Sequence, residues 1–316
     1  MGVEREAPVI FVEDLHMYYG RFHAVDGLSF RVERGEIYAL LGPNGAGKTT
    51  TVEILEGHRR RTSGEVTVLG HDPWRGGRRL RERVGIVLQS GGFDADLSVG
   101  EMVRVYAGLY AHPRDVGDTI DQVGLGGKQR ARVRTLSGGQ LRRLGLALAL
   151  IGDPELIFLD EPTTGFDPSA RRSAWEMIGR LRDLGKTVVL TSHYLDEVQE
   201  LADRVGVLSA GTLIAESTPT ELGGRDLAET VISFRLPDRA GDLPRGPWTE
   251  PEAHGDLVTV RTDHPTRALF ALTSWVMGHG EELRALTVAR PSLEDVYLQL
   301  TEETRSARTG SVRDAK

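Results

Sequence analysis

Residues 36–50 read EIYALLGPNGAGKTT, an apolar run that leads directly into a glycine-rich loop. The run at 36–41 is almost continuously apolar, which is typical of a strand buried on both faces of a sheet. The loop at 42–49 matches G-x-x-x-x-G-K-[ST], a pattern that is informative when a strand precedes it and a helix follows it. Both neighbours are expected here, so this stretch predicts an α/β domain with a phosphate-binding loop.

Glycine residues allow the backbone N–H groups of such a loop to converge on phosphate oxygens, because no Cβ atom stands in the way. The helix that begins near Gly47 adds the positive end of its dipole. Lys48 supplies a point charge for the β- and γ-phosphates of a nucleotide, and the Thr49 hydroxyl supplies a ligand for Mg²⁺. The alternative, a chance turn with a surface lysine, does not account for the strand and the helix on either side.

Two other apolar runs end in residues that can take part in phosphate chemistry. LIFLD at 156–160 is followed by Glu161, and TVVLTSH at 187–193 ends in His193. Ligands of parallel sheets lie at the carboxyl ends of the strands, so we expect these side chains near the bound phosphates. Asp160 is suited to hold Mg²⁺ through its water shell, and Glu161 to orient or deprotonate the attacking water. The alternatives are a solvent-facing acidic turn and a structural histidine.

A second glycine-rich stretch, LSGGQ at 136–140, lies far from the first and begins a helical pattern at 138–151. Ser137 can cap this helix, and Ser137, Gly138 and Gly139 can direct hydroxyl and backbone N–H donors at a phosphate. A serine-capped helix start is also the ordinary structural interpretation. The two interpretations do not exclude each other.

The order of these motifs resembles the ATPase subunit of an ABC transporter, a P-loop NTPase with an additional helical signature subdomain. The matching elements lie between residues 10 and 215, and they are GPNGAGKTT, Gln89 in VGIVLQS, LSGGQ, LIFLDEP, the turn TTGFDP and His193. The resemblance implies a mostly parallel sheet covered by helices, and the hydrolysis of ATP with Mg²⁺. It implies that 42–50 is the Walker A loop, Gln89 the Q-loop residue, 136–140 the ABC signature, Asp160 and Glu161 the Walker B aspartate and catalytic glutamate, Asp167 the D-loop aspartate and His193 the switch histidine.

The resemblance therefore implies three sets of site residues. The catalytic set is Glu161, His193, Gln89 and Lys48. The nucleotide-binding set is Tyr19, Gly42, Pro43, Asn44, Gly45, Ala46, Gly47, Lys48, Thr49, Thr50, Ser137, Gly138, Gly139, Gln140 and Asp167. The metal-binding set is Thr49, Gln89 and Asp160. Tyr19, in MYYGRFHAV, matches the aromatic residue that stacks on adenine, and the neighbouring Tyr18 is the alternative.

In this family two ATPase domains pack head to tail, and the LSGGQ of one closes over the nucleotide held by the Walker A loop of the other. This arrangement explains why one chain carries two distant glycine-rich loops. No catalytic position is degenerate, and Phe166, where leucine is more common, is not a phosphate-binding position. We therefore expect a homodimer of ATPase subunits upon ATP binding, with two identical sites.

The chain of 316 residues is longer than one mid-sized core requires, which favours one large and one small domain. Proline, glycine and acidic residues concentrate beyond residue 215, and strand-like and helical patterns follow them. We expect an ATPase domain at 8–218, a linker at 219–226, a small α+β accessory domain at 227–303 and a polar, disordered tail at 304–316.

No apolar run approaches the roughly 18 residues that cross a bilayer, and the first residues lack the pattern of a secretory signal. Cysteine is absent, which excludes disulfides and thiolate metal sites. The net charge of −7 argues against nucleic acid as a partner. A transporter function thus requires a separate transmembrane permease subunit. We expect the chain at the cytoplasmic face of a bacterial cell membrane, with residues around 89–110 contacting that subunit.

The single ATPase domain, VTVLGHDP at 66–73 and PSLEDVYLQL at 291–300 resemble the bacterial drug- and antibiotic-resistance exporter ATPases of the daunorubicin-resistance type. This resemblance implies export of a drug, antibiotic or lipid-like compound. The competing hypothesis is a soluble, non-transport ABC ATPase that acts on nucleic acid, the ribosome or a regulatory partner. The acidic charge and the lack of a second ATPase domain or long coiled coil argue against it.

Overall fold

The structure, a computed structural model, describes residues 7–87, 92–224, 228–236, 243–298 and 300–301. The chain divides into two compact units, Met1–Pro219 and Thr220–Lys316, and each is described by itself. The domain boundaries expected from the sequence remain predictions, and the expected tail at 304–316 lies outside the described residues.

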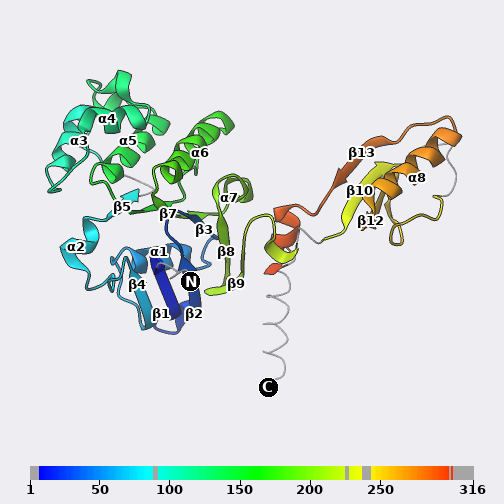
Figure 1. The fold of residues 1–316 in the computed structure, drawn as a ribbon, viewed down its shortest axis with the longest axis horizontal. Helices are drawn as coiled ribbons and strands as arrows, with labels where there is room; N and C mark the ends of the chain where they lie inside the picture. The colour runs from blue at the N-terminus through cyan, green and yellow to red at the C-terminus, as the bar shows by residue number, and fades with distance from the viewer. Residues whose placement is uncertain (1–6, 88–91, 225–227, 237–242, 299, 302–316) are drawn as a thin grey trace, which may run out of the picture. The chain divides into compact units, whose positions relative to one another are not determined.

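The first unit is built on a six-stranded sheet in the order β5-β6-β7-β3-β8-β9 (Figure 1). Its strands are β3 (Ile37–Leu41), β5 (Val84–Val87), β6 (Leu156–Asp160), β7 (Thr187–Ser192), β8 (Arg204–Ser209) and β9 (Thr212–Ser217). All neighbouring pairs are parallel except β8 and β9, which form an antiparallel hairpin. Every residue of β3 and β7 is buried, as the continuous apolar runs predict for central strands. The predicted mostly parallel α/β sheet is confirmed.

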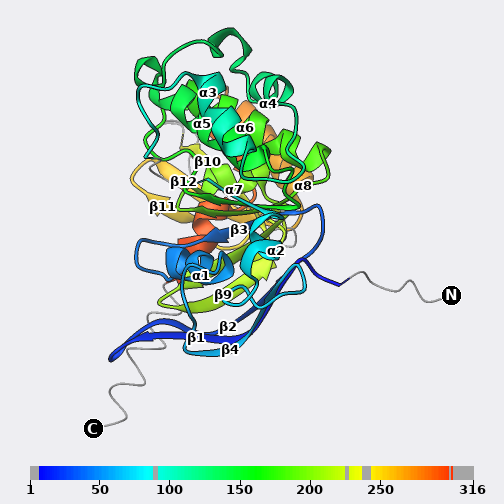
Figure 2. The same cartoon turned by 90° about the vertical axis from the view of Figure 1, so that its left-hand side faces the viewer.

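A second, three-stranded antiparallel sheet was not predicted from the sequence. It contains β1 (Ile10–Tyr19), β2 (Phe22–Val32) and β4 (Ser63–Val68), in the order β2-β1-β4. Figure 2 shows helix α1 (Lys48–Leu55) between this sheet and β3. Buried side chains from both sheets and from α1 form one continuous core. The helix that follows the phosphate loop is therefore held on two sides.

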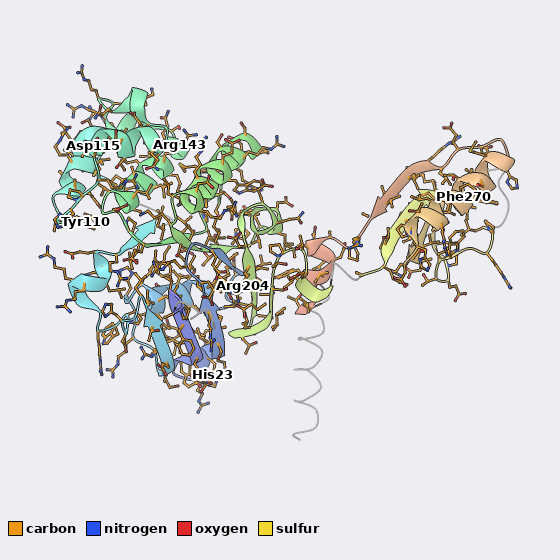
Figure 3. The ribbon with its side chains drawn as sticks, viewed as in Figure 1. His23, Tyr110, Asp115, Arg143, Arg204 and Phe270 are labelled. Atoms are coloured by element: carbon orange, nitrogen blue, oxygen red, sulfur yellow. The ribbon has the colours of Figure 1, made fainter. Side chains whose placement is uncertain are left out.

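The remaining helices of this unit are α2 (Gly77–Arg81), α3 (Val99–Ala107), α4 (Val116–Gln122), α5 (Gly138–Leu150), α6 (Pro168–Asp183) and α7 (Leu195–Leu201). Short 3₁₀ turns occupy Gly126–Lys128 and Val133–Thr135. Helices α3, α4 and α5 contact one another and form a helical group that carries Tyr110, Asp115 and Arg143 (Figure 3). Asp115 accepts a hydrogen bond from the backbone of Asp118 and so caps α4. This group corresponds to the expected helical subdomain.

The second unit is a small α+β fold. Its sheet contains β10 (Thr230–Arg235), β11 (Glu252–His254), β12 (Leu257–Thr262) and β13 (Arg284–Ala289), antiparallel in the order β11-β12-β10-β13. Helix α8 (Pro265–Gly278) packs on it, and a 3₁₀ turn at Leu222–Gly224 precedes it. The core contains Ile232, Phe234, Val258, Val260, Ala268 and Leu272. Residues 293–298 and 300–301 are helical, and Ser292 caps this segment through Asp295.

Two side chains on α8 provide a matched test of this core. Leu272 has no exposed surface, whereas Phe270 on the same helix is 74% exposed (Figure 3). Leu272→Ala should lower the free energy of unfolding of the second unit by about 2–5 kcal/mol, because it leaves a cavity. Phe270→Ala should change it by less than about 0.5 kcal/mol. Urea unfolding of the whole chain, followed by circular dichroism, measures both, and similar losses in the two variants would contradict the assigned packing.

Candidate functional site

The glycine-rich loop is held by close backbone contacts. A Cβ atom at Gly42 would lie 2.5 Å from the carbonyl oxygen of Leu208. A Cβ atom at Gly47 would lie 2.5 Å from the carbonyl oxygen of Ala24, and Gly47 also has a φ of +102°. Only glycine tolerates such a left-handed conformation at so close an approach. These contacts fix the loop at the start of α1, which begins at Lys48.

Lys48 lies inside this loop and is only 6% exposed. Its Nζ atom donates to the carbonyl oxygens of Gly42 at 2.6 Å and Pro43 at 3.2 Å. Burial lowers the pKa of Lys48, while the charges of Glu161 and Asp160 act in the opposite direction. The ammonium group and the two carboxylates predicted from the sequence are therefore brought together at one edge of the sheet.

The strand register explains this convergence. Asp160, the last residue of β6, is paired with Thr191 of β7, and Leu41 of β3 is paired with Ser192. The Thr191 hydroxyl donates to Asp160 Oδ1 at 2.5 Å and accepts from the backbone N–H of Glu161 at 3.0 Å. Thr191 thus fixes both acidic residues. The sequence analysis did not identify it, although its place two residues before His193 was a usable signal.

Glu161 has an unusual backbone conformation and a defined side-chain position. Its φ of +44° places a non-glycine residue in the left-handed region, a strain that persists only where the surroundings impose it. Glu161 Oε1 lies 3.2 Å from His193 Nδ1, and the Thr164 hydroxyl donates to Glu161 Oε2 at 3.1 Å. The side chains of Glu161 and His193 are 18% and 31% exposed. The expected catalytic pair is therefore in contact and open to solvent.

The second glycine-rich stretch forms the start of α5. Ser137 caps this helix by accepting from the backbone of Gln140, whose side chain accepts from Ser137 N–H in return. A cavity of about 640 Å³ lies beside it and is lined by Val87, Phe93, Ser137, Gly138, Gly139, Leu141, Arg142, Gly145, Thr164, Gly165, Phe166, Asp167 and Ala170. No residue of the first loop, 42–50, lines this cavity. Within one chain the structure therefore does not bring the two loops to the same cavity.

Asp167 closes the turn that borders this cavity. Its Oδ1 atom accepts from the backbone N–H groups of Ser169 and Ala170, each at 2.9 Å, and so caps α6. The turn 164–167 thus shares a cavity with the signature residues and ends at a fixed helix start. Asp167 thus lies beside the second glycine-rich stretch, and its role as the D-loop aspartate stays a prediction.

The two tyrosines at the end of β1 have different surroundings. Tyr19 is 41% exposed, and the guanidinium of Arg59 lies 5.2 Å from its ring centroid. Tyr18 packs its ring 4.1 Å from that of His23, and its hydroxyl lies 2.8 Å from His16 Nδ1. An exposed ring is available to stack on a base, which favours Tyr19. Gln89 lies outside the described residues, so its catalytic and metal-binding roles stay predictions.

The residues predicted to hold Mg²⁺ fit that ion chemically. Among the described residues, no group of three or more His, Asp or Glu side chains forms a metal site. Mg²⁺ in phosphate-transfer sites is usually held by one or two protein oxygens together with substrate phosphates. Thr49 is exposed at the first turn of α1, and the Thr191 bond to Asp160 uses only Oδ1 of its carboxylate. The pair provides the oxygen ligands that this kind of site needs.

Two stretches of the chain match known protein families, and most of the chain matches characterised relatives. Residues 25–164 match the family described as ABC transporter, and residues 230–292 match the family described as ABC transporter domain-containing protein-like, C-terminal domain. The chain is 36% identical over 296 residues to the daunorubicin/doxorubicin resistance ATP-binding protein DrrA of Streptomyces peucetius, covering 90% of this chain and 89% of DrrA. It is 37% identical over 307 residues to the Nod factor export ATP-binding protein I of Ralstonia nicotianae, covering 93% and 94%. The chain belongs to the ABC transporter ATP-binding family.

A solved structure supports this assignment. The structure of cbiO1 from Clostridium perfringens, part of the ABC transporter complex cbiONQ, matches with a TM-score of 0.63 at 30% identity and covers 68% of this chain and 90% of that one. The chain is accordingly an ATP-binding and ATP-hydrolysing subunit of an ABC transporter. Across the described residues no helix combines the length and apolar character that a membrane crossing requires. The predicted family, fold and ATPase activity are confirmed, whereas the individual site residues remain predictions.

A pair of threonines on β7 tests the geometry of this ABC ATPase site. Thr191→Val should lower kcat roughly 10- to 100-fold with little change in ATP affinity, because both acidic residues lose their anchor. Thr187 on the same strand is equally buried, but it accepts from Gly35 N–H. Thr187→Val should therefore cost about 1 kcal/mol of stability without a comparable loss of kcat. Steady-state ATPase assays and nucleotide titrations distinguish the two, and equal kcat values in both variants would refute the role of Thr191.

Proposed function

We propose that this chain powers the export of a drug, antibiotic or lipid-like compound through a separate transmembrane permease subunit, at the cytoplasmic face of a bacterial membrane. The main support is the contact between Glu161 and His193 beside Lys48, an intact hydrolytic arrangement. The similarity to resistance and export ATP-binding proteins extends along about nine-tenths of the chain and supports the direction of transport.

The proposed roles in ATP binding follow from the loop geometry. The backbone N–H groups of residues 44–48 and the Lys48 ammonium bind the β- and γ-phosphates. Lys48 exchanges its present bonds to loop carbonyls for phosphate oxygens, which its flexible stem permits. Thr49 and Asp160 hold Mg²⁺, which when bound neutralises charge on the phosphates. Tyr19 stacks on the adenine ring.

Glu161 is proposed to act on the attacking water. One of its carboxylate oxygens accepts from Thr164 and the other lies against His193, so the side chain has few alternative orientations. A carboxylate held in this way can orient the water and accept its proton. His193 can contact the γ-phosphate through its second ring nitrogen while Nδ1 faces Glu161. Glu161 then acts on the attacking water, and His193 acts on the phosphate that the water attacks.

A homodimer is proposed to complete each site. Ser137 and Gly138 are exposed, and a methyl group at Gly138 or Gly139 would meet no other atom within 4 Å. This helix start can therefore approach the phosphates held by a second subunit, with its dipole and N–H groups directed at them. Head-to-tail pairing supplies the contact that a single chain does not provide.

The permease subunit is proposed to contact α3 and the residues that follow it. Val105, Tyr106 and Leu109 are 57%, 36% and 65% exposed. Tyr110, in contrast, packs its ring against Gly152, where a Cβ atom would lie 2.3 Å from it. Tyr106 thus suits an interface, whereas Tyr110 contributes to packing. Grouped exposed apolar side chains are typical of protein contact surfaces.

Glu161→Gln provides the test of the transporter assignment. The variant should bind ATP and accumulate as a dimer, because its turnover falls by roughly 10²–10⁴-fold when the general base is lost. Tagged protein from host membranes solubilised with ATP should carry a multi-span membrane protein in near-stoichiometric amount. Glu176→Gln, on the exposed face of α6, is the matched control and should hydrolyse ATP normally. Recovery only from the soluble fraction, or with ribosomes or DNA, would favour the non-transport alternative.

Ser137→Arg tests the head-to-tail dimer. The long side chain should fill the space that a partner's phosphates need, so ATP should still bind the monomer while dimerisation is lost. Ser137→Ala removes the helix cap without adding bulk, and it should retain dimerisation with a stability loss of about 1 kcal/mol. Light scattering with ATP in the Glu161→Gln background reports both. A Ser137→Arg protein that still dimerises would contradict the proposed geometry.

A further inference from the structure

A buried carboxyl group lies directly behind the hydrolytic pair. Glu197, on α7, has no exposed surface. Its Oε1 atom accepts from the Thr163 hydroxyl at 2.7 Å and from the indole N–H of Trp175 at 3.3 Å. Its Oε2 atom accepts from the Ser192 hydroxyl at 2.6 Å. Three donors from three separate segments thus converge on one side chain.

Two of these donors are next to the proposed catalytic residues in the chain. Thr163 follows Glu161 by two positions, and Ser192 directly precedes His193. Glu161 and His193 touch each other at 3.2 Å. The shared carboxyl group therefore connects the two backbone segments that carry this pair, so it limits how far apart they can move.

The third donor connects this network to α6. Trp175 lies two turns into that helix, whose start is capped by Asp167. A second contact runs parallel to it: the guanidinium of Arg171 lies 4.3 Å from the ring centroid of Tyr194, and the rings of Tyr194 and His193 are 4.0 Å apart. Helix α6 therefore contacts Glu197 through Trp175 and the neighbour of His193, Tyr194, through Arg171. A shift of its first turn is transmitted to both.

The chemistry of the network suits an acceptor-only group at position 197. A carboxylate only accepts hydrogen bonds, so it can serve two hydroxyls and an indole at once. Glutamine would turn an NH₂ group toward one of these partners, so a hydroxyl such as that of Ser192 would have to accept that bond and donate its own hydrogen elsewhere, for example to the Tyr194 carbonyl oxygen. Burying a carboxyl group costs free energy unless hydrogen bonds compensate for it. An apolar side chain would fill this space without that cost, so packing alone does not explain a glutamate here.

We propose that Glu197 is a positioning residue that sets the geometry of the Glu161–His193 pair and makes it depend on the position of α6. The inference rests on the proposed roles of that pair. The turn 164–167 at the start of α6 lines the same cavity as the signature residues. In the proposed dimer, closure at this cavity moves the turn, and Glu197 conveys the movement to the hydrolytic residues.

Glu197→Gln in the full-length protein is the primary test. We expect kcat to fall roughly 10- to 100-fold while ATP affinity, measured with ATP and EDTA, changes little. Glu197→Asp keeps an acceptor-only group on a shorter stem and should recover part of the lost rate. Trp175→Phe keeps a half-buried aromatic ring but removes the α6 donor, and it should lower kcat with little loss of stability. It remains informative if Glu197→Gln does not fold.

A double-mutant cycle separates positioning from general stability. If Glu197 acts through His193, then Glu197→Gln should cost little further rate in a His193→Ala background, as measured in single turnovers. Ile178→Val, a core substitution in α6, is the control and should affect both backgrounds equally. Normal kcat in Glu197→Gln, or the same fold-loss in both backgrounds, would overturn the proposal.

The outcomes also separate this inference from the proposed function. Normal turnover in Glu161→Gln or His193→Ala would refute the roles assigned to the pair. If those variants are inactive and Glu197→Gln is fully active, only the positioning role fails.

Discussion

The register of three buried parallel strands is the constraint on which the site depends. β6, β7 and β3 are adjacent, and at their ends Asp160 is paired with Thr191 and Leu41 with Ser192 at one edge. Everything that follows those strands, namely the acidic residues, the histidine and the phosphate loop, is delivered to the same place. Because the strands are closely packed on both faces, a slip in their register would disturb that packing and displace the residues at their ends.

The central strands and the phosphate loop could be predicted from sequence because their signals are local. EIYALL, LIFLD and TVVLTS each have the apolar pattern of a strand buried on both faces. They lead directly into the phosphate loop, the acidic pair and His193, respectively. The antiparallel sheet of β1, β2 and β4 was missed for a physical reason. The β1 strand contains register shifts, so its buried and exposed positions do not alternate regularly.

Residues that support the site are harder to find than those that perform its chemistry. Thr191 and Glu197 belong to no glycine-rich motif, and each has a partner in a distant part of the chain. Thr163 is 34 positions from Glu197, and Asp160 is 31 positions from Thr191. A hydrogen bond over such a separation leaves no periodicity in the sequence. The family resemblance predicted the reactive groups, while the three-dimensional packing shows which residues hold them.

The close approach at Gly42 and Gly47 has a consequence for how this sequence can change. The atoms that exclude a side chain there are the backbone carbonyl oxygens of Leu208 and Ala24, not neighbouring side chains. In most tightly packed cores a larger residue can be accommodated when a neighbour becomes smaller. Here no neighbour can shrink, since every amino acid carries the same carbonyl group. A second substitution that makes a neighbouring side chain smaller therefore cannot compensate for a larger residue at either glycine.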